Sequence, residues 1–497
     1  MARRHALVLC VVGLAAAGCT TGPDYKRPEL QVPPAYRGAG DVVRTAGADA
    51  QTFGTLAWTS VFTDPELQGL IRTALAQNYD LRVAVSRILQ AQSQVTIAGA
   101  QPYPTVDAAV TAPYTGYSGS DRPATLPDNS IQPQAGFGVA WELDFWGKFR
   151  RNSEAAWADL LATEEARYAV MATLVSQVGQ AYLNLRALDL SLEISRRTEN
   201  SRRQSLELVQ ARLDGGVASI MEVRQAETLL YSATKTIPEL QRQIEQNENL
   251  INVLLGQNPG PVQRGRPLEQ QIVAPTLPPG LPSDLLERRP DIRQAEQQLV
   301  SANAQIGVAK ALLYPRITLN GFAGGGGATI DGTTFGPYGI LGIVPSITLP
   351  VFDMGRLQAN VEFNEALAQE AGLRYRQTLQ QAFREVADAL VEVRKRQEFR
   401  QQQELLVNAL ADASQVANIR YEGGVSSYLE VLDTERQYFD AEVQLVLAKR
   451  DEYASVIQLY KALGGGWQPD PPAVAAAGGE ATSTPTASAS TGSRPSR

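Results

Sequence analysis

The chain carries two nearly identical segments about two hundred residues apart. Residues 212–223 read RLDGGVASIMEV, and residues 420–431 read RYEGGVSSYLEV. Each has an acidic residue, a Gly-Gly pair, a valine, a short turn and then Glu-Val, which is typical of a tight reversal between two helices. A repeated helix–turn–helix tip predicts two copies of one unit and a pseudo-symmetric fold. Because an active site needs one unique set of residues, the duplication favours a scaffold or a conduit.

The repeat extends beyond these tips. Three further pairs of blocks match in the same order, namely DLR at 80–82 with DIR at 291–293, Tyr103-Pro104 with Tyr314-Pro315, and FWGK at 145–148 with DMGR at 353–356. Each half is therefore expected to run as a short helix, a Tyr-Pro pair, an apolar stretch, a very long helix, a Gly-Gly tip and a return helix.

Two stretches without proline predict unusually long helices. Residues 134–237 and 351–468 contain no proline and are dense in Ala, Leu, Gln, Glu and Arg, with apolar residues three and four positions apart. Helices over 148–213 and 356–422 would each span about 100 Å at 1.5 Å per residue. A helix of this length is too long for a globular domain, so coiled-coil-like packing is expected.

Four apolar stretches alternate with a period of two residues. Phe137, Val139, Trp141 and Leu143 share one face with Phe145, while small or acidic residues fill the other. Strands of about ten residues with one apolar face fit a membrane barrel. Two amphipathic hairpins of a soluble sheet are the alternative. The secretion signal described below, and the lack of an apolar membrane-length helix, favour the barrel.

Four strands per chain are too few for a barrel with a lumen, because the smallest barrels have about eight. Open sheet edges are not tolerated in lipid. Several copies of the chain must therefore share one barrel, although this argument leaves their number open.

The N-terminus resembles a bacterial lipoprotein signal. Arg3 and Arg4 precede an apolar run over 6–17 that is too short to span a membrane. The sequence AAAGC then places small residues before Cys19, which would become the acylated first residue of the mature chain. Ala16 departs from the usual leucine, so an ordinary signal peptide with an incidental cysteine is the alternative.

The composition speaks against most enzyme classes. Removing residues 1–18 would remove His5 and Cys10, leaving no histidine and only Cys19. That excludes Ser-His-Asp and Cys-His sites, imidazole-bound zinc and structural disulfides. The formal net charge of −7 argues against nucleic-acid binding. The chain has no phosphate-binding loop. We expect no enzyme activity, no cofactor and no metal.

Several motifs in order give the chain a family resemblance. These are CTTGPDYKRPEL after the signal, WTSVFTDPEL, LRVA, both Tyr-Pro pairs, FWGK, both GGV tips and the terminal YKALGGGW. Over residues 19–467 the chain resembles the outer-membrane efflux lipoproteins, the OprM-like and NodT-like relatives of TolC. The resemblance implies an α+β membrane protein that forms a homotrimer. Its 12-stranded outer-membrane β-barrel, four strands per chain, would continue into an antiparallel α-helical periplasmic tunnel built from two internal repeats.

The resemblance also implies a function and partners. The trimer would receive drugs or other small molecules from an inner-membrane pump, of the resistance-nodulation-division type, through a periplasmic adaptor. It would conduct them passively to the exterior while anchored to outer-membrane lipid. The rival hypothesis is a lipid-anchored coiled-coil spacer or adhesin, which explains the long helices but gives the alternating strands no purpose.

The expected organisation follows from these patterns. Its parts are a signal peptide over 1–18, a lipid-anchored extended arm over 19–57, a first repeat over 58–255, an equatorial segment over 256–290, a second repeat over 291–468 and a disordered tail over 469–497. Barrel strands are expected at about 105–113, 135–145, 316–323 and 340–351. Return helices are expected from 219, with an interruption at Pro238, and over 427–463.

In the family, an acidic ring narrows the periplasmic mouth just after the second tip. The resemblance carries this ring to Glu430 and Asp433, and a gate tyrosine to Tyr421. Ser426 stands where some relatives have a gate arginine.

A local role competes for the glutamate. Both Ser219-x-x-Glu222 and Ser427-x-x-Glu430 fit a capping box, in which serine and glutamate satisfy the free amides of a helix start. Asp433 lies one turn further along the helix and has no capping role. Its counterpart in the first half is Gln225.

The tips are the expected contacts with the adaptor. The residues concerned are Gly215, Gly216, Val217, Gly423, Gly424 and Val425. The glycines also answer a structural need, because a tight reversal favours a positive φ.

Overall fold

The structure is a computed structural model that describes residues 20–29, 32–37, 52–116, 125, 127–271, 280 and 282–467. The expected signal peptide, Cys19 and the tail over 469–497 lie outside these ranges. The main elements are α2 (Trp58–Val61), α3 (Pro65–Gln77), α4 (Tyr79–Ala100), β1 (Thr105–Thr111), β2 (Tyr114–Gly116), β3 (Asn129–Ile131), β4 (Gln134–Leu143), α5 (Lys148–Asp214), α6 (Ile220–Thr234), α7 (Thr236–Leu254), α8 (Leu285–Arg288), α9 (Pro290–Ala311), β5 (Arg316–Ile330), β6 (Thr333–Thr348), α10 (Arg356–Glu422) and α11 (Tyr428–Ala462). None of the described helices combines the length and hydropathy needed to cross a membrane.

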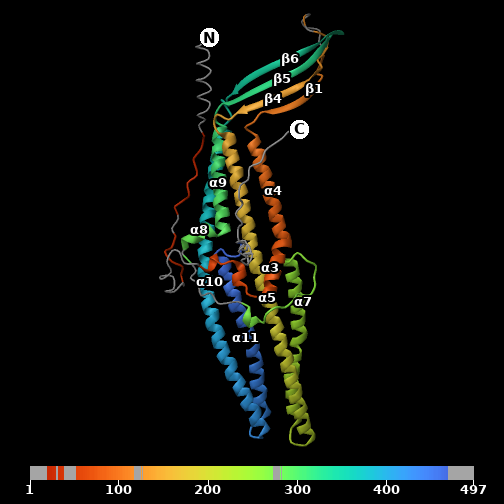
Figure 1. Ribbon diagram of the computed structural model, residues 1–497, viewed down its shortest axis with the longest axis vertical. Helices are drawn as coiled ribbons and strands as arrows, with labels where there is room; N and C mark the ends of the chain where they lie inside the picture. The colour runs from red at the N-terminus through yellow and green to blue at the C-terminus, as the bar shows by residue number, and fades with distance from the viewer. Residues whose placement is uncertain are drawn as a thin grey trace, which may run out of the picture.

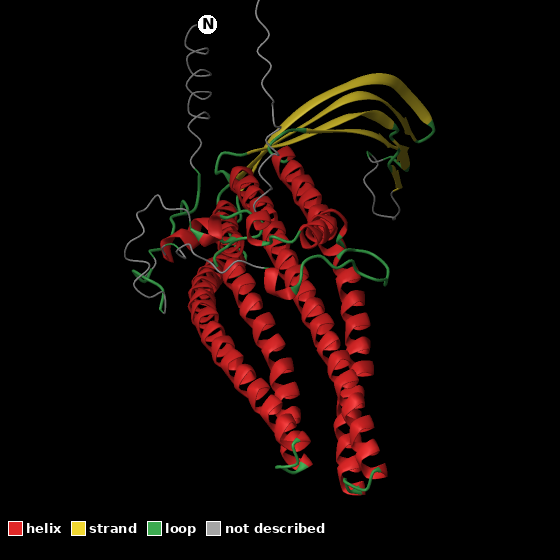
Figure 2. Cartoon of the chain, turned by 60° about the horizontal axis from the view of Figure 1, so that its bottom comes forward, coloured by secondary structure: helices red, strands yellow, loops and turns green. Residues whose placement is uncertain are grey.

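The molecule is a long bundle of helices with a curved sheet at one end (Figures 1 and 2). The helices α5 and α10 each run for 67 residues, within one residue of the spans expected from the sequence. Each starts after a glycine in the left-handed region, Gly147 with φ 74° and Gly355 with φ 82°. These glycines turn the chain from the sheet into the helices.

The return helices differ between the two halves. The first is broken at Lys235 into α6 and α7, whereas α11 continues unbroken for 35 residues. The break has a local cause, because Pro238 has no amide hydrogen to donate to the carbonyl one turn earlier. Its counterpart in α11 is Val446, which keeps its amide.

The sheet is a four-stranded antiparallel array in the order β1-β4-β5-β6, with β2 and β3 extending it. The pairs Thr111↔Gln134 and Tyr114↔Ile131 lie on one continuous register, so β2 prolongs β1 and β3 prolongs β4. Proline interrupts each strand in this gap, at positions 113 and 133, because it cannot donate to the ladder. The sheet thus has four strands in space.

The second-half strands are longer than their expected spans of 316–323 and 340–351, because a glycine run belongs to the sheet. The expected strand stops at residue 323, just before the glycine run over 324–327, and glycine is depleted in strands. In the structure these glycines continue β5, and Gly324 pairs with Gly136 of β4. A Cβ on Gly136 would lie 2.5 Å from the carbonyl oxygen of Ala323. Glycine is needed here for close approach of two backbones.

The two faces of the sheet differ in polarity. Paired residues point to the same side, so the register places Val139, Gly321 and Ile343 on one face and Glu142, Thr318 and Ser346 on the other. The first face carries a band of exposed apolar side chains, namely Val106, Val110, Phe137, Val139, Leu341, Ile343 and Ile347. The outer edges of β1 and β6 have no partner strand among the described residues. An apolar face and two open edges require further copies of the sheet in a membrane.

The two repeats also share clamps at the middle of the molecule. Asn78 donates to the carbonyl of Leu254 at 2.9 Å, and Arg289 donates to the carbonyl of Ala462 at 3.1 Å. Each contact joins the start of a short helix to the end of the return helix of the same repeat. The two contacts stand at equivalent places, so the pseudo-symmetry of the repeats includes these clamps.

Candidate functional site

Both long helices end in the same backbone turn at the pole opposite the sheet. At the first tip the amides of Gly216 and Val217 donate back to the carbonyls of Leu213 and Arg212, each at 2.9 Å. The second tip repeats both bonds. This pattern is a Schellman motif, which puts one residue in the left-handed region. That residue is Gly216 with φ 76° and, in the second tip, Gly424 with φ 71°.

The requirement for a positive φ applies only to the second glycine of each pair. Gly215 has φ −78° and Gly423 has φ −74°, which any residue adopts. A Cβ at either position would meet its nearest backbone oxygen at 3.4 Å, an ordinary contact. Backbone geometry therefore explains Gly216 and Gly424 and leaves the first glycines free for another role.

The tips expose apolar side chains. Val217 and Val425 are each 69% exposed. Ile220, Met221 and Leu429, in the first turns of α6 and α11, are also exposed. The side chains at this pole are thus available to a partner in the single chain.

Just above the tips, the two hairpins pack against each other. We call this buried group the tip cluster; it consists of Val209, Val223, Ala226, Leu229, Ala417, Tyr421, Tyr428 and Val431. Tyr421 is 6% exposed and packs edge-on against Tyr428 with ring centroids 5.1 Å apart. The cluster joins α5 and α6 of the first hairpin to α10 and α11 of the second.

Tyr421 makes the polar link between the hairpins. Its hydroxyl donates to Glu222 Oε2 at 3.0 Å, and the guanidinium of Arg212 lies over its ring at 4.6 Å. Burial, followed by the bond to Glu222, raises the pKa of Tyr421. The phenol therefore stays protonated at neutral pH and acts as the donor. We call this contact the tether.

The two predicted capping boxes have different outcomes. The Ser219 hydroxyl accepts from the amide of Glu222 at 3.4 Å, so the first serine caps its helix. Ser427 makes no side-chain cap bond, and Glu430 instead forms an ion pair with Arg420 at 3.5 Å. The interpretation of Glu430 as one half of a capping box is therefore wrong. The reason is that Arg420, at the end of α10, is within reach of its carboxylate.

The predicted gate residues separate into two groups. Glu430 and Asp433 line one open groove of about 440 Å³ together with Asp412 and Arg420. Tyr421 lies in the tip cluster and points to the first hairpin. Asp433 is half-exposed, and its carboxylate contacts two residues of its own helix, Arg436 at 3.2 Å and Gln437 at 2.7 Å.

Further links join the hairpins at positions that no sequence pattern indicates. One of these links is Arg202 of α5, 2% exposed, which donates to the carbonyl of Leu229 at 2.7 Å and to that of Glu435 at 3.2 Å. Its neighbour Arg197 pairs with Glu442 of α11 at 2.6 Å. Burial lowers the pKa of Arg202. Arginine in a helix of this composition is usually solvated, so nothing in the sequence distinguishes Arg202 from its neighbours.

Ser426, in the second tip, has a buried hydroxyl. Among the described residues this hydroxyl has no hydrogen-bond partner. In the part of the chain that the structure describes, Ser426 therefore adds no polar link between the hairpins, whereas the tether and Arg202 do.

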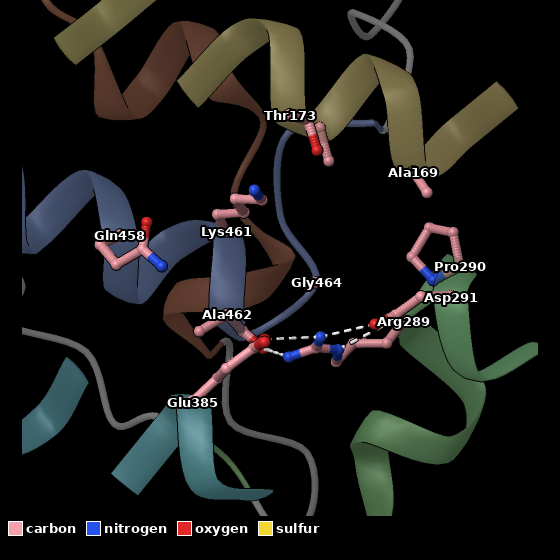
Figure 3. A pocket seen from close by; sticks show the side chains of 11 residues that line it. Ala169, Thr173, Arg289, Pro290, Asp291, Glu385, Gln458, Lys461, Ala462 and Gly464 are labelled. Carbon is pink, nitrogen blue, oxygen red and sulfur yellow. Dashed lines mark hydrogen bonds and ion pairs between the residues drawn. The ribbon is translucent and has the colours of Figure 1, made fainter. Parts of the chain in front are cut away.

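A cavity of about 220 Å³ lies at the middle of the molecule, between α5, α9, α10 and the end of α11 (Figure 3). Its central side chain is Arg289, which pairs with Asp291 at 2.6 Å and with Glu385 at 2.8 Å. Burial by itself would lower the pKa of Arg289, but the carboxylates of Asp291 and Glu385 together raise it. The donors of Arg289 are engaged by the protein itself, so the cavity is built as a structural clamp.

The start of the described chain lies at the foot of the sheet. The amide of Thr21 donates to the carbonyl of Trp146 at 3.1 Å, and the Thr21 hydroxyl donates to the carbonyl of Gly307 at 3.0 Å. Residue 20 therefore sits beside the junction of β4 and α5. Cys19 itself is outside the described residues.

Comparison with known proteins identifies the architecture. Residues 70–257 and 281–465 match the model of the outer membrane efflux protein family. The chain is 36% identical to the solvent efflux pump outer membrane protein SrpC of Pseudomonas putida, over 91% of this chain and 97% of that one. It is 33% identical to the cation efflux system protein CusC of Escherichia coli, over 92% and 98%. It is 31% identical to the open state of the Neisseria gonorrhoeae MtrE outer membrane channel, with a TM-score of 0.80 over 90% and 99%.

These relatives decide between the hypotheses. They are efflux channels, so the spacer or adhesin is set aside and the chain is not an enzyme. The expected fold is confirmed: three chains with four strands each close a β-barrel in the outer membrane, above a helical tunnel in the periplasm. The chain belongs to the outer membrane efflux protein family.

Proposed function

We propose that this chain is the exit duct of a tripartite system that passes small molecules, without chemical change, from an inner-membrane pump of the resistance-nodulation-division type to the exterior. The observation that carries the proposal is the continuity of an apolar-faced sheet with helices of 67 residues that end in exposed tips. At about 1.5 Å per residue, such helices reach about 100 Å from the barrel. A passive duct selects its cargo only weakly, because the pump does the choosing, and the similar proteins SrpC and CusC are named for the efflux of solvents and cations respectively.

The proposal is tested in cells that lack their own exit channel. The chain should restore resistance to a pump substrate only when both a pump and an adaptor are present. Resistance that is independent of the adaptor would contradict it.

The adaptor is proposed to bind the tips. The exposed valines, Val217 and Val425, stand at equivalent places in the two hairpins, so a repeated adaptor surface can engage both. Backbone geometry does not require glycine at Gly215 or Gly423. Without side chains, these two residues leave the tip surface free of protruding atoms.

The gate is proposed to be the second hairpin, closed by the tether and Arg202 and bordered by the carboxylates of Glu430 and Asp433. Glu222 and Arg202 belong to the first hairpin and bind the second. Opening therefore requires the second hairpin to move away from the first. Three copies of the acidic groove around one axis would repel each other and attract cations.

Asp433→Asn is expected to reduce the cation selectivity of the open channel, because it removes one carboxylate per chain from the mouth. Reversal potentials in planar bilayers under a salt gradient measure this. Asp388→Asn, which removes a carboxylate in the middle of α10, is the matched control. An unchanged reversal potential in Asp433→Asn would remove this residue from the gate.

We also propose that Cys19 is acylated. Thr21 is bonded to Trp146 at the foot of the sheet, so a lipid on Cys19 would lie where the barrel meets the periplasm. Cys19→Ser should therefore abolish incorporation of labelled palmitate. Cys10→Ser is the control, because Cys10 lies in the expected signal peptide. Label retained by Cys19→Ser would favour the ordinary signal peptide.

A further inference from the structure

The curved sheet joins the helices at one end of the molecule (Figure 2). A second cavity lies at this junction. It has a volume of about 320 Å³ and is lined by the ends of β4 and β6, the start of β5 and the starts of α5 and α10. The lining residues that matter here are Glu142, Trp146, Lys148, Tyr314, Arg316 and Arg356. We call it the junction cavity.

The carboxylates of the junction cavity are already neutralised. Glu142 forms an ion pair with Lys148. Asp144 accepts from the amides of Phe149 and Arg150 at 3.1 and 3.0 Å, which caps the start of α5. Neither carboxylate is left to balance a further cation.

Two arginines remain in excess. Arg316 at the start of β5 and Arg356 at the start of α10 are both exposed. Within the described ranges, neither guanidinium has a hydrogen bond or an ion pair. Each carries a full positive charge and five donors in a planar fork, which suits a carboxylate, sulfonate or phosphate.

One wall of the cavity is aromatic and fixed. The rings of Trp146 and Tyr314 are stacked, with centroids 4.8 Å apart and an interplanar angle of 22°. Trp146 Nε1 donates to the carbonyl of Pro315 at 2.8 Å, which holds the indole in place. A flat apolar group can lie on such a wall while its anionic end reaches the arginines.

The register places the strand residues of this cavity on the polar face of the sheet, which is the interior face of the barrel. Arg316 pairs with Thr348, and two residues further along β5 Thr318 pairs with Glu142, so all four lie on the polar face. The opposite face carries the exposed apolar band that suits lipid. On β1 the polar face bears one carboxylate, Asp107, which is too few to neutralise both arginines.

We propose that the junction cavity is a binding site for amphiphilic organic anions, such as aromatic sulfonates and carboxylates, inside the channel. Arg316 and Arg356 bind the anionic group, and the Trp146–Tyr314 wall holds the apolar part. Threefold symmetry makes a ring of these sites, which attracts anionic cargo at the far end of a duct whose mouth is acidic. The placement inside a lumen rests on the proposed function.

The test is the binding of naphthalene-1-sulfonate to the full-length trimer in neutral detergent, measured by titration calorimetry. The double variant Arg316→Gln with Arg356→Gln should weaken binding by about a hundredfold, since each lost charge-assisted bond contributes about a factor of ten or more. Lysine at both positions should restore part of the binding. Arg242→Gln, which removes an exposed arginine on α7, should leave binding unchanged.

Two further measurements separate this proposal from the channel function. Naphthalene-1-sulfonate should reduce the conductance of the wild-type channel in planar bilayers and spare the double variant. Equal binding by the double variant would overturn the site. Displacement of the sulfonate by phosphatidylglycerol vesicles, but by no free organic anion, would overturn it as well. A channel that conducts but binds no sulfonate would overturn the site and leave the proposed function standing. A trimer that binds the sulfonate but never conducts would overturn the proposed function and leave the site standing.

Discussion

Tyr421→Phe combined with Glu222→Gln is expected to raise the basal conductance of the channel in planar bilayers several-fold. The tether is a hydrogen bond of 3.0 Å between a buried phenol and a carboxylate. Bonds to a charged group contribute about 1.5 to 3 kcal/mol, and each of the three chains loses one. Because Tyr421 keeps its ring in the tip cluster, the substitution removes the link between hairpins while preserving the packing.

Tyr438→Phe provides the matched control. Its hydroxyl also donates to a glutamate, Glu442, at 3.0 Å, but both residues lie on α11. The control loses the same kind of bond without breaking a contact between the hairpins, so its basal conductance should equal that of the wild type. Equal conductance of the tether variant and Tyr438→Phe would mean that the tether does not close the channel.

Val217→Asp combined with Val425→Asp is expected to abolish cross-linking to the adaptor and, with it, efflux. Both valines are exposed in the single chain, so carboxylates there should leave the fold intact. In a docked tip they would be buried against the adaptor without a partner, which costs several kcal/mol per chain. Site-directed cross-linking in cells measures the contact, and resistance to a pump substrate measures the outcome.

The control for the tip variant is Val253→Asp. Val253 is exposed to a similar degree but lies on α7, at the opposite end of the first hairpin. It should cross-link and export normally. If the double tip variant also did so, the adaptor would have to bind elsewhere on the tunnel.

The regular parts of this fold could be predicted from the sequence because a single physical pattern determines each of them. The absence of proline and the spacing of apolar residues place α5 and α10 within one residue. Alternation places the four strands, although β5 continues to Ile330 through its glycines. Glycine depletion in strands is a statistical tendency, whereas the close approach of Gly136 and Gly324 is visible only in the folded sheet.

The site was less predictable, because its contacts join residues far apart in the chain. Tyr421 and Glu222 are 199 positions apart, and their bond depends on how the hairpins pack. The capping-box pattern fits Ser427 and Glu430 as well as Ser219 and Glu222, yet Arg420 withdraws Glu430 from that role. Arg202 gives no signal at all, since an arginine in a long helix is normally solvated.

The difference between the two repeats is functionally more informative than their similarity. Tyr428 replaces Ile220 of the first tip and adds a second buried ring beside Tyr421. Asp433 replaces Gln225 and adds a carboxylate to the groove. The common framework builds the tunnel, and these departures gather at the mouth that we propose as the gate.

Mixing of chains tests the central claim, that three copies share one conducting pore. Wild-type chains and tether-variant chains are co-expressed with different tags, and single-channel conductances are recorded from the purified mixture. One pore per trimer predicts a separate conductance class for each number of variant chains from none to three. Recordings that show only the wild-type and the tether-variant conductances, in the proportions in which the two chains were supplied, would contradict a shared pore.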